Sequence, residues 1–465
     1  MSEKAQKGVY PFWKLGAYAA PSIPISAIGI PMVAYLPTYY ATEFGLSLAL
    51  IGTIFLIVRL ADIALDPVAG SLMDRNRTRF GRFRPWLVAG ALPMAVSAYM
   101  LFNPGDTADI LFLTVWLSVA YIAYSFCYLS HLSWGMSLTN DYSERSRVFG
   151  YWQAGSLVGM ISVLGLPILV EGVFGYSHST AIQSMGVFIA VTIIACVVIA
   201  IAFVPEPKAA STHQSTSVRE YLGLMVRPTI TRLLIADLLI GTALGMNSAL
   251  FFFYFGYVKG FPQLNIVILL FVNLCGSLCG TSIWTYLTTK MGKHKAAAIA
   301  FTFYALSLIV IQFTPTIMSV NVVILFAAGL TLSAGPLLLR SMLADAGDEE
   351  LLRSGVDQTG ILSALFTGTN KVGLAIAPGF SFMILGFYQF SATSPENTGG
   401  ALIALQALYI FVPAILGVFV ALVIRNHPLT EARHAEILGA LKARQEDPVS
   451  VEIHEPHFGA VEGAS

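Results

Sequence analysis

The sequence is poor in charge. Asp, Glu, Lys and Arg make up 11% of its 465 residues, whereas soluble domains carry roughly 25%. The 26 acidic and 26 basic residues cancel, so no nucleic acid or other polyanion is expected as a partner. Because 56% of the residues are hydrophobic and the mean hydropathy is +0.73, an ordinary water-soluble globule is excluded.

Groups that catalyse reactions or bind metals are scarce as well. The four cysteines lie in apolar runs, and no set of His and Cys has the spacing of a metal site. We find neither a phosphate-binding loop nor a nucleophile–base motif, and the short polar start of the chain shows no cleavable signal peptide. We therefore expect no enzyme activity, no cofactor and no metal centre built from histidine and cysteine.

Long apolar runs recur along most of the chain. A helix of about 20 apolar residues spans a bilayer and satisfies its own backbone hydrogen bonds there. The alternating segments of about ten residues that a β-barrel needs do not appear. We predict an all-α membrane protein with twelve transmembrane helices, near 13–40, 48–72, 86–103, 109–137, 148–171, 182–204, 230–257, 264–289, 295–315, 320–344, 358–388 and 400–425.

A polar stretch in the middle of the chain separates six predicted spans from six. It predicts four parts: an N-terminal bundle at 1–205, a central cytoplasmic loop at 206–229, a C-terminal bundle at 230–425 and a cytoplasmic tail at 426–465. Each half has a basic loop after its second span, as a duplicated 6+6 transporter would. Two unrelated membrane anchors are the alternative explanation for these loops.

The distribution of Lys and Arg predicts the orientation. Of the 26 basic residues, all but Arg59, Lys259 and Lys371 lie at the N-terminus, in even-numbered loops, in the tail or at the span ends that adjoin these. Basic residues mark cytoplasmic loops, so we expect a multi-pass protein of the inner membrane with both termini in the cytoplasm. Apolar residues among charges at 430–445 predict an amphipathic helix on the membrane surface, with a loosely ordered tail as the alternative.

The second predicted span carries three charges. Arg59, Asp62 and Asp66 have spacings of three and four, which place them on one helix face. A charge at the bilayer centre costs about 2.5–3.5 kcal/mol on insertion scales, so such residues need a partner or a function. Arg59 can pair with one carboxylate, which leaves one negative charge for Na⁺, Li⁺ or a proton to neutralise. The alternative is a structural salt bridge with one aspartate protonated.

In the second half, we predict that Lys371 is the one buried charge. Thr367, Thr369 and Asn370 precede it. If the two halves face each other, the ammonium approaches the carboxylates, where it would compete with the cation or bind a substrate. A lysine that extends to the membrane interface is the alternative.

The fourth predicted span offers polar groups to a central cavity. Ser125 and Tyr128 carry hydroxyl groups, and Trp134 is either a stacking surface or an interfacial anchor. His131 is either a proton relay or, more commonly for a lone histidine, a hydrogen-bonded packing residue.

Four segments resemble one transporter family. They are RLADIALDP at 59–67, RFGRFRPW at 79–86, LTNDYSER at 138–145 and MLADAGD at 342–348. Together with Lys371 they resemble the glycoside–pentoside–hexuronide:cation symporters, the group of the melibiose permease within the major facilitator superfamily. The first two segments are the specific ones.

The resemblance implies two six-helix bundles around a cavity that opens alternately to the two sides of the membrane. It implies a cation site at Asp62 and Asp66, helped by the hydroxyl of Ser125, with Arg59 and Lys371 close by. It also implies gate or interdomain contacts, which map onto Asp74, Arg75, Arg79, Asp141, Arg145 and Asp345.

The acids that bind sugar in the melibiose permease have no counterpart here. No acidic residue lies between Lys14 and Glu43 or between Asp109 and Asp141, and Trp152 and Gln153 stand about where the family has an arginine. We expect a monomeric carrier in the lipid bilayer that couples a cation to the movement of a small solute, a glycoside or related sugar. A carrier of an amphiphile such as a lysolipid, or a non-transporting sensor, is the alternative. The expected substrate site comprises Arg59, Tyr128, Trp134, Trp152, Gln153, Thr367, Asn370 and Lys371.

Overall fold

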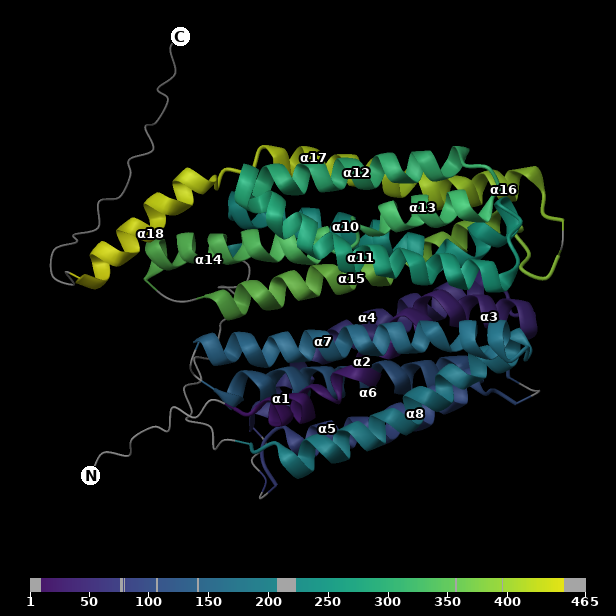
Figure 1. Ribbon diagram of the computed structural model, residues 1–465, viewed down its shortest axis with the longest axis horizontal. Helices are drawn as coiled ribbons and strands as arrows, with labels where there is room; N and C mark the ends of the chain where they lie inside the picture. The colour runs from purple at the N-terminus through teal and green to yellow at the C-terminus, as the bar shows by residue number, and fades with distance from the viewer. Residues whose placement is uncertain are drawn as a thin grey trace, which may run out of the picture.

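The computed structural model describes residues 10–75, 78, 80–105, 108–139, 142–206, 223–355, 358–394 and 396–446. Long helices dominate this part of the chain and run roughly side by side (Figure 1). In the first half they are α1 (Phe12–Ala19), α2 (Ser22–Ala27), α3 (Leu36–Glu43), α4 (Leu48–Arg75), α5 (Arg84–Phe102), α6 (Ile110–Leu138), α7 (Tyr142–Pro167) and α8 (His178–Phe203). In the second half they are α10 (Pro228–Phe253), α11 (Gln263–Met291), α12 (Lys293–Phe313), α13 (Met318–Gly329), α14 (Arg340–Ser354), α15 (Thr359–Phe387), α16 (Gly399–Gln406), α17 (Val412–Arg425) and α18 (Glu431–Glu446).

Eleven stretches of the described residues are long and apolar enough to cross a membrane. The span predicted near 320–344 is not one continuous helix. It consists of α13, a π-helical segment at Gly335–Leu339 and α14, which extends to Ser354. The prediction of twelve crossing segments therefore holds only if these three pieces count as one broken segment.

Close backbone packing explains the break after α13. A Cβ on Gly276 would lie 2.2 Å from the carbonyl oxygen of Phe326, and a Cβ on Gly280 would lie 2.1 Å from that of Leu330. The two glycines let α13 and the following turn approach the backbone of α11. The indole of Trp284 then donates a hydrogen bond of 2.7 Å to the carbonyl of Leu330, so a polar group freed by the turn is satisfied within the protein.

The first span is also interrupted. It runs from Phe12 to Glu43 as α1, α2, a π-helical segment at Pro31–Tyr35 and α3. Proline lacks the backbone N–H that an α-helix needs, and its ring crowds the preceding turn. Pro21, Pro31 and Pro37 lie where these pieces meet or begin.

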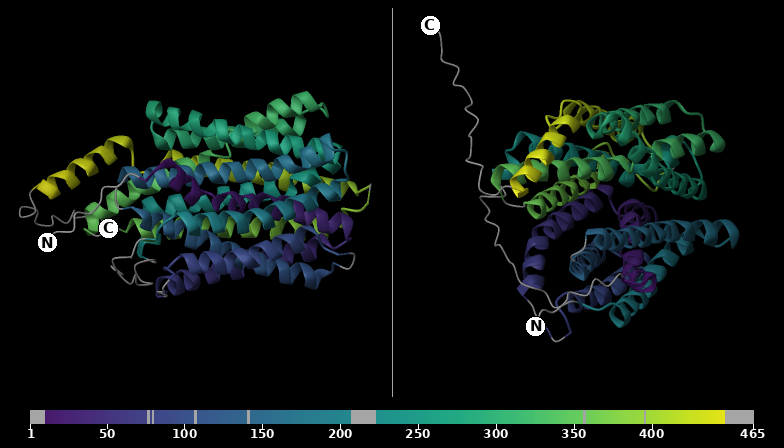
Figure 2. Two further views of the ribbon diagram at one scale, coloured as in Figure 1. Left: turned by 60° about the horizontal axis from the view of Figure 1, so that its bottom comes forward. Right: turned by 60° about the vertical axis from the view of Figure 1, so that its left-hand side comes forward.

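The two halves of the chain form two bodies. Within the first, α5 packs on α6 and α8, and α2 packs on α7; within the second, α10 packs on α15 and α17, and α11 packs on α13. The right-hand view of Figure 2 separates the purple and blue half from the green and yellow half. The long helices α4 and α15 contact each other across the boundary.

The two bodies meet at the end opposite α18, called the far end below. There the ring of Tyr35 lies 4.5 Å from that of Phe252. A Cβ on Gly52 would lie 2.7 Å from the Cβ of Phe382, and one on Gly379 would lie 2.7 Å from the Cβ of Leu56. Glycine on both α4 and α15 thus allows tight contact of the two bodies at the far end.

The tail contains a helix, as its sequence pattern predicts. In α18, Ile437 is 2% exposed, and the helix packs against α14 rather than standing free. A loosely ordered tail is therefore the wrong alternative for residues 431–446. The buried side of α18 faces protein.

Candidate cation and substrate site

Four charged side chains meet between the two bodies. Arg59, Asp62 and Asp66 lie on one face of α4, and Lys371 reaches them from α15. The Lys371 ammonium hydrogen-bonds Asp66 Oδ2 and lies 3.6 Å from Asp62 Oδ2. Arg59 Nη1 lies 3.6 Å from the same Asp62 oxygen. We call these four residues the charge cluster.

The charge cluster is neutral as it stands. The second span alone has the surplus negative charge that its sequence predicts, but Lys371 of the other body cancels it. Lys371 is 9% exposed, so it is a buried ion-pair partner rather than a lysine at the membrane interface. The two halves face each other and the Lys371 ammonium lies against both carboxylates, as predicted from the sequence.

The carboxylates have oxygen atoms to spare. Asp62 is 2% exposed, and Ser125 Oγ donates a hydrogen bond of 2.6 Å to its Oδ1. Asp62 Oδ2 and Asp66 Oδ1 are buried and accept no hydrogen bond from the described residues. Hard cations prefer carboxylate and other oxygen ligands. Two carboxylates and one hydroxyl therefore form a suitable ligand set once the ammonium moves away.

Arg59 connects the charge cluster to a cavity of about 400 Å³. Its guanidinium lies 4.7 Å from the ring centre of Tyr121. Both bodies contribute to the wall, and most of the lining side chains are apolar. They are Ser26, Ile28, Gly29, Ile30, Met32, Val33, Phe55, Arg59, Tyr121, Tyr124, Trp152, Gln153, Ser156, Met160, Ser248, Leu374, Ala375 and Pro378.

Some of the predicted substrate residues reach this cavity and others do not. Trp152 and Gln153 line it. Tyr128 stacks on the ring of Tyr124 at 5.7 Å and meets Trp152 edge-on at 6.0 Å, so it supports the wall from behind. Thr367 is not among the lining residues.

Three side chains predicted for the site or for proton relay have other contacts. Trp134 is fully buried, and its indole donates a hydrogen bond of 3.2 Å to the carbonyl of Pro205. Asn370 donates to Asp237. The ring of His131 bonds the carbonyl of Tyr18 at 2.7 Å and packs on the Tyr18 ring at 4.7 Å. The geometry of His131 is that of a packing residue.

A buried carboxylate in the second half was absent from the sequence-based predictions. Asp237 of α10 is 2% exposed, so the prediction that Lys371 is the one buried charge of this half is wrong. Its oxygens accept hydrogen bonds from Thr369 Oγ1 at 3.0 Å and Asn370 Nδ2 at 3.2 Å. The signal was present, because Asp237 lies well inside the predicted span 230–257.

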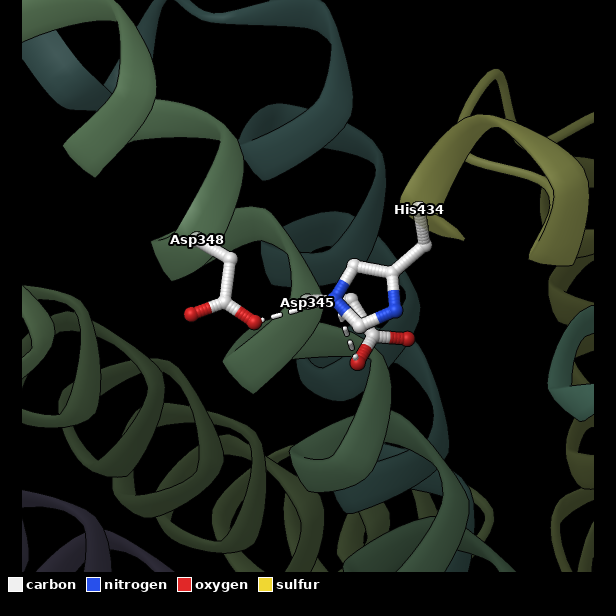
Figure 3. Close-up of side chains that lie close together, drawn as sticks. All are labelled: Asp345, Asp348 and His434. Atoms are coloured by element: carbon white, nitrogen blue, oxygen red, sulfur yellow. Dashed lines mark hydrogen bonds and ion pairs between the residues drawn. The ribbon is translucent and has the colours of Figure 1, made fainter. Parts of the chain in front are cut away.

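Of the predicted gate residues, only Asp345 has a described side chain. Lys293 Nζ binds both of its oxygens, at 2.6 and 2.8 Å. His434 of α18 lies 3.6 Å from Asp345, and its Nε2–H donates a 2.9 Å hydrogen bond to Asp348 Oδ2 (Figure 3). These partners belong to the second half, so the group joins α18 to α14. Asp74, Arg75, Arg79, Asp141 and Arg145 lie outside the described residues or have side chains that are not described.

The carboxylates of Asp345 and Asp348 and the ring of His434 also satisfy a geometric criterion for a metal site. Their ligand atoms lie within 4.8 Å of one another. However, the Lys293 ammonium already neutralises Asp345. We therefore interpret this group as an ion-pair contact.

Comparison with known proteins identifies the family of the chain. A family described as "MFS/sugar transport protein" matches residues 17–431. The chain belongs to this family. It is therefore a multi-pass membrane transporter of the major facilitator superfamily and not an enzyme.

Individual relatives agree with this assignment. The chain is 25% identical to the putative glycoside/cation symporter YagG of Escherichia coli, over 86% of this chain and 88% of YagG. It is 23% identical to the sodium-dependent lysophosphatidylcholine symporter 1-B of Danio rerio, over 96% and 92%. The crystal structure of the nucleoside transporter NupG shares the fold, with a TM-score of 0.65 at 11% identity, over 89% of this chain and 99% of that one.

Proposed function

We propose that this transporter is a symporter that couples a glycoside or related small solute to a monovalent cation, Na⁺ or H⁺. The observation that carries the proposal is the charge cluster, in which an ammonium from one body lies against two carboxylates of the other. Similarity to a protein named as a putative glycoside/cation symporter supports the same function. We include in the proposal that one chain is the transporting unit, since both bodies of a single chain line the cavity.

Competition between Lys371 and the cation supplies the coupling in this proposal. The two carboxylates bind either the ammonium or the ion, because both need the same oxygens. The ammonium belongs to α15 and the carboxylates belong to α4, so cation binding breaks an ion pair between the bodies. This changes the energy of every conformation in which α4 and α15 touch. Coupling energies between ligands are typically about 1–3 kcal/mol, below the roughly 3–5 kcal/mol that it costs to leave one partner of a buried ion pair uncompensated.

We propose that the described conformation faces the cytoplasm. The basic loops predict that the end bearing α18 is cytoplasmic, and the tight contacts between the bodies lie at the far end. In this orientation Lys371 binds the carboxylates after the cation has left. The neutral cluster then lets the empty carrier return without moving an unpaired charge through the bilayer.

The residues of the cavity wall indicate the chemical class of the substrate. Trp152, Tyr124 and Gln153 line the cavity, and aromatic rings together with an amide suit a sugar ring. The remaining wall is largely apolar, which favours a substrate with an apolar part. This is the observation that keeps a lysolipid-like amphiphile as the second candidate, alongside similarity to the lysophosphatidylcholine symporter.

Uptake by proteoliposomes tests the proposal. Purified protein is first screened for thermal stabilisation by Na⁺, Li⁺ and pH together with glycosides, uronides and lysolipids, because a ligand that binds the native state raises its stability. Radiolabelled uptake of the hit is then measured with and without a cation gradient. We expect Asp62→Asn and Asp66→Asn to abolish uphill accumulation. Glu396→Gln, at an exposed position that does not line the cavity, should retain it. Undiminished uphill accumulation in both aspartate variants would overturn the proposal.

A further inference from the structure

One charged side chain lines the cavity between the two bodies. Among the described residues of the wall, Arg59 is the only Asp, Glu, Lys or Arg, and its side chain is 15% exposed. A guanidinium stays ionised in proteins. A solute in this cavity of about 400 Å³ therefore meets a fixed positive charge on a wall that is otherwise uncharged and mostly apolar.

The guanidinium of Arg59 has hydrogen-bond donors to spare. An arginine carries five N–H donors, and none of the described residues accepts a hydrogen bond from this side chain. Its ion-pair partner, Asp62 Oδ2, lies 3.6 Å from Nη1, beyond hydrogen-bond length. Asp62 is also bound by Ser125 and approached by Lys371. The donors of Arg59 are thus available to a group that enters the cavity.

An aromatic ring helps to position the guanidinium of Arg59. Its Cζ lies over the ring of Tyr121, 4.7 Å from the ring centre, and a cation–π contact of this kind is attractive without using the N–H donors. The planar fork of a guanidinium matches the paired oxygens of a carboxylate or phosphate group. The geometry around Arg59 therefore suits an oxyanion.

The cation site of the proposed symport lies beside Arg59, because Asp62 is common to both. A cation at Asp62 and Asp66 adds a positive charge there and offsets the repulsion between the Asp62 carboxylate and an incoming anion. By linkage, the anion raises the affinity for the cation by the same factor. An anionic substrate therefore gives the carrier a direct electrostatic link between its two ligands.

We propose that the substrate is an organic anion whose carboxylate or phosphate group binds Arg59, while its ring or apolar part packs on the rest of the cavity wall. This inference deepens the proposed function and rests on it. It gives the one charge of the wall a ligand. A neutral solute would leave the Arg59 donors without an ionised acceptor.

Three probes that differ only at one carbon of the sugar test the inference. They are 4-nitrophenyl β-D-glucoside, which is neutral, the corresponding glucuronide, which carries a carboxylate, and the corresponding glucoside 6-phosphate. Binding to the purified full-length protein is measured at a saturating level of whichever cation stabilises it, Na⁺, Li⁺ or H⁺. We expect at least one acid to bind about tenfold or more tightly than the neutral probe, equivalent to about 1.4 kcal/mol. The stronger of the two acids identifies the oxyanion as carboxylate or phosphate.

Variants of the wall assign the preference to Arg59. In Arg59→Gln the preference for the acid over the neutral probe should fall below about threefold, whereas Arg59→Lys, which keeps the charge, should retain a preference for the acid. Gln153→Ala is the matched control, because it removes an uncharged polar side chain from the same wall. Its acid-to-neutral ratio should equal that of the wild type. A merely structural role of Arg59 would instead weaken the binding of every probe alike, which would refute the inference.

The wild-type protein decides the question even if Arg59→Gln does not fold. Cation titrations with and without each probe should show that the preferred acid raises the apparent cation affinity at least about threefold more than the neutral glucoside does. Equal effects of the acids and the neutral probe would refute the inference. So would tighter binding of the neutral probe, or a protein that binds a cation but neither acid. A wild-type protein that responds to none of the cations would instead refute the proposed symport.

Discussion

Replacing Lys371 with glutamine is the sharpest perturbation of the charge cluster. The ammonium hydrogen-bonds Asp66 and lies 3.6 Å from Asp62 Oδ2. At an effective dielectric constant of about 20, a charge pair at this separation is worth roughly 4 kcal/mol before desolvation is counted. Removing one partner of a buried pair leaves the other charges uncompensated at a cost of about 3–5 kcal/mol. A cation relieves that cost, so we expect Lys371→Gln to bind it at least about tenfold more tightly than the wild type.

Transport by the same variant distinguishes competition from simple damage. In proteoliposomes with saturating cation on both sides, substrate exchange should continue, because the loaded carrier does not need the lysine. Net uptake should fall, since the cation-free variant holds an unpaired carboxylate at bilayer depth. Lys371→Arg, which keeps the charge, is the control and should retain an affinity near that of the wild type. Unchanged or weaker cation binding in Lys371→Gln would show that the ammonium does not compete with the ion.

Two further predictions concern the far end and the tail. Gly52→Val places a Cβ 2.7 Å from that of Phe382, so it should separate the two bodies at the far end. The reporter is Tyr35→Cys in a background without native cysteines, and we expect a thiol reagent to label it faster in the Gly52→Val variant. Gly70→Val, on the same helix with no atom within 4 Å of the added Cβ, is the control and should leave the labelling rate unchanged. In the tail, burial lowers the pKa of His427, whose ring accepts a hydrogen bond from the Leu429 amide and bonds the Thr229 carbonyl, with Arg232 and Glu349 as the nearby charges. The neutral ring is the form that binds the Thr229 carbonyl, so the contact of this tail segment with α10 is fully formed above the ordinary histidine pKa of about 6.5 and weakens as the pH falls below it. Amide hydrogen exchange of residues 426–430, measured in a His434→Gln background, should therefore accelerate as the pH falls below that value. An exchange rate that does not depend on pH after correction for intrinsic exchange would contradict this.

Features carried by a single helix were predictable from the sequence. The apolar spans follow from run length, because each must cover the same bilayer thickness. The common face of Arg59, Asp62 and Asp66 follows from helical spacing, and the tail helix follows from its apolar and charged pattern. The family was also recognisable, because its motifs lie in short contiguous segments.

Which helices contact each other, and through which faces, could be seen only in the tertiary structure. Lys371 meets Asp66 across 305 positions of sequence, and Asp237 meets Thr369 across 132; no local pattern says which faces of two helices will touch. The same limit explains why Trp134 and Asn370 looked like cavity residues, since their type suits a binding site but the rotation of their helices directs them elsewhere. The break after α13 depends on two glycines of α11 that admit its backbone. Hydropathy and spacing act along one helix, whereas the orientation of each polar side chain is decided by the close packing of its neighbours.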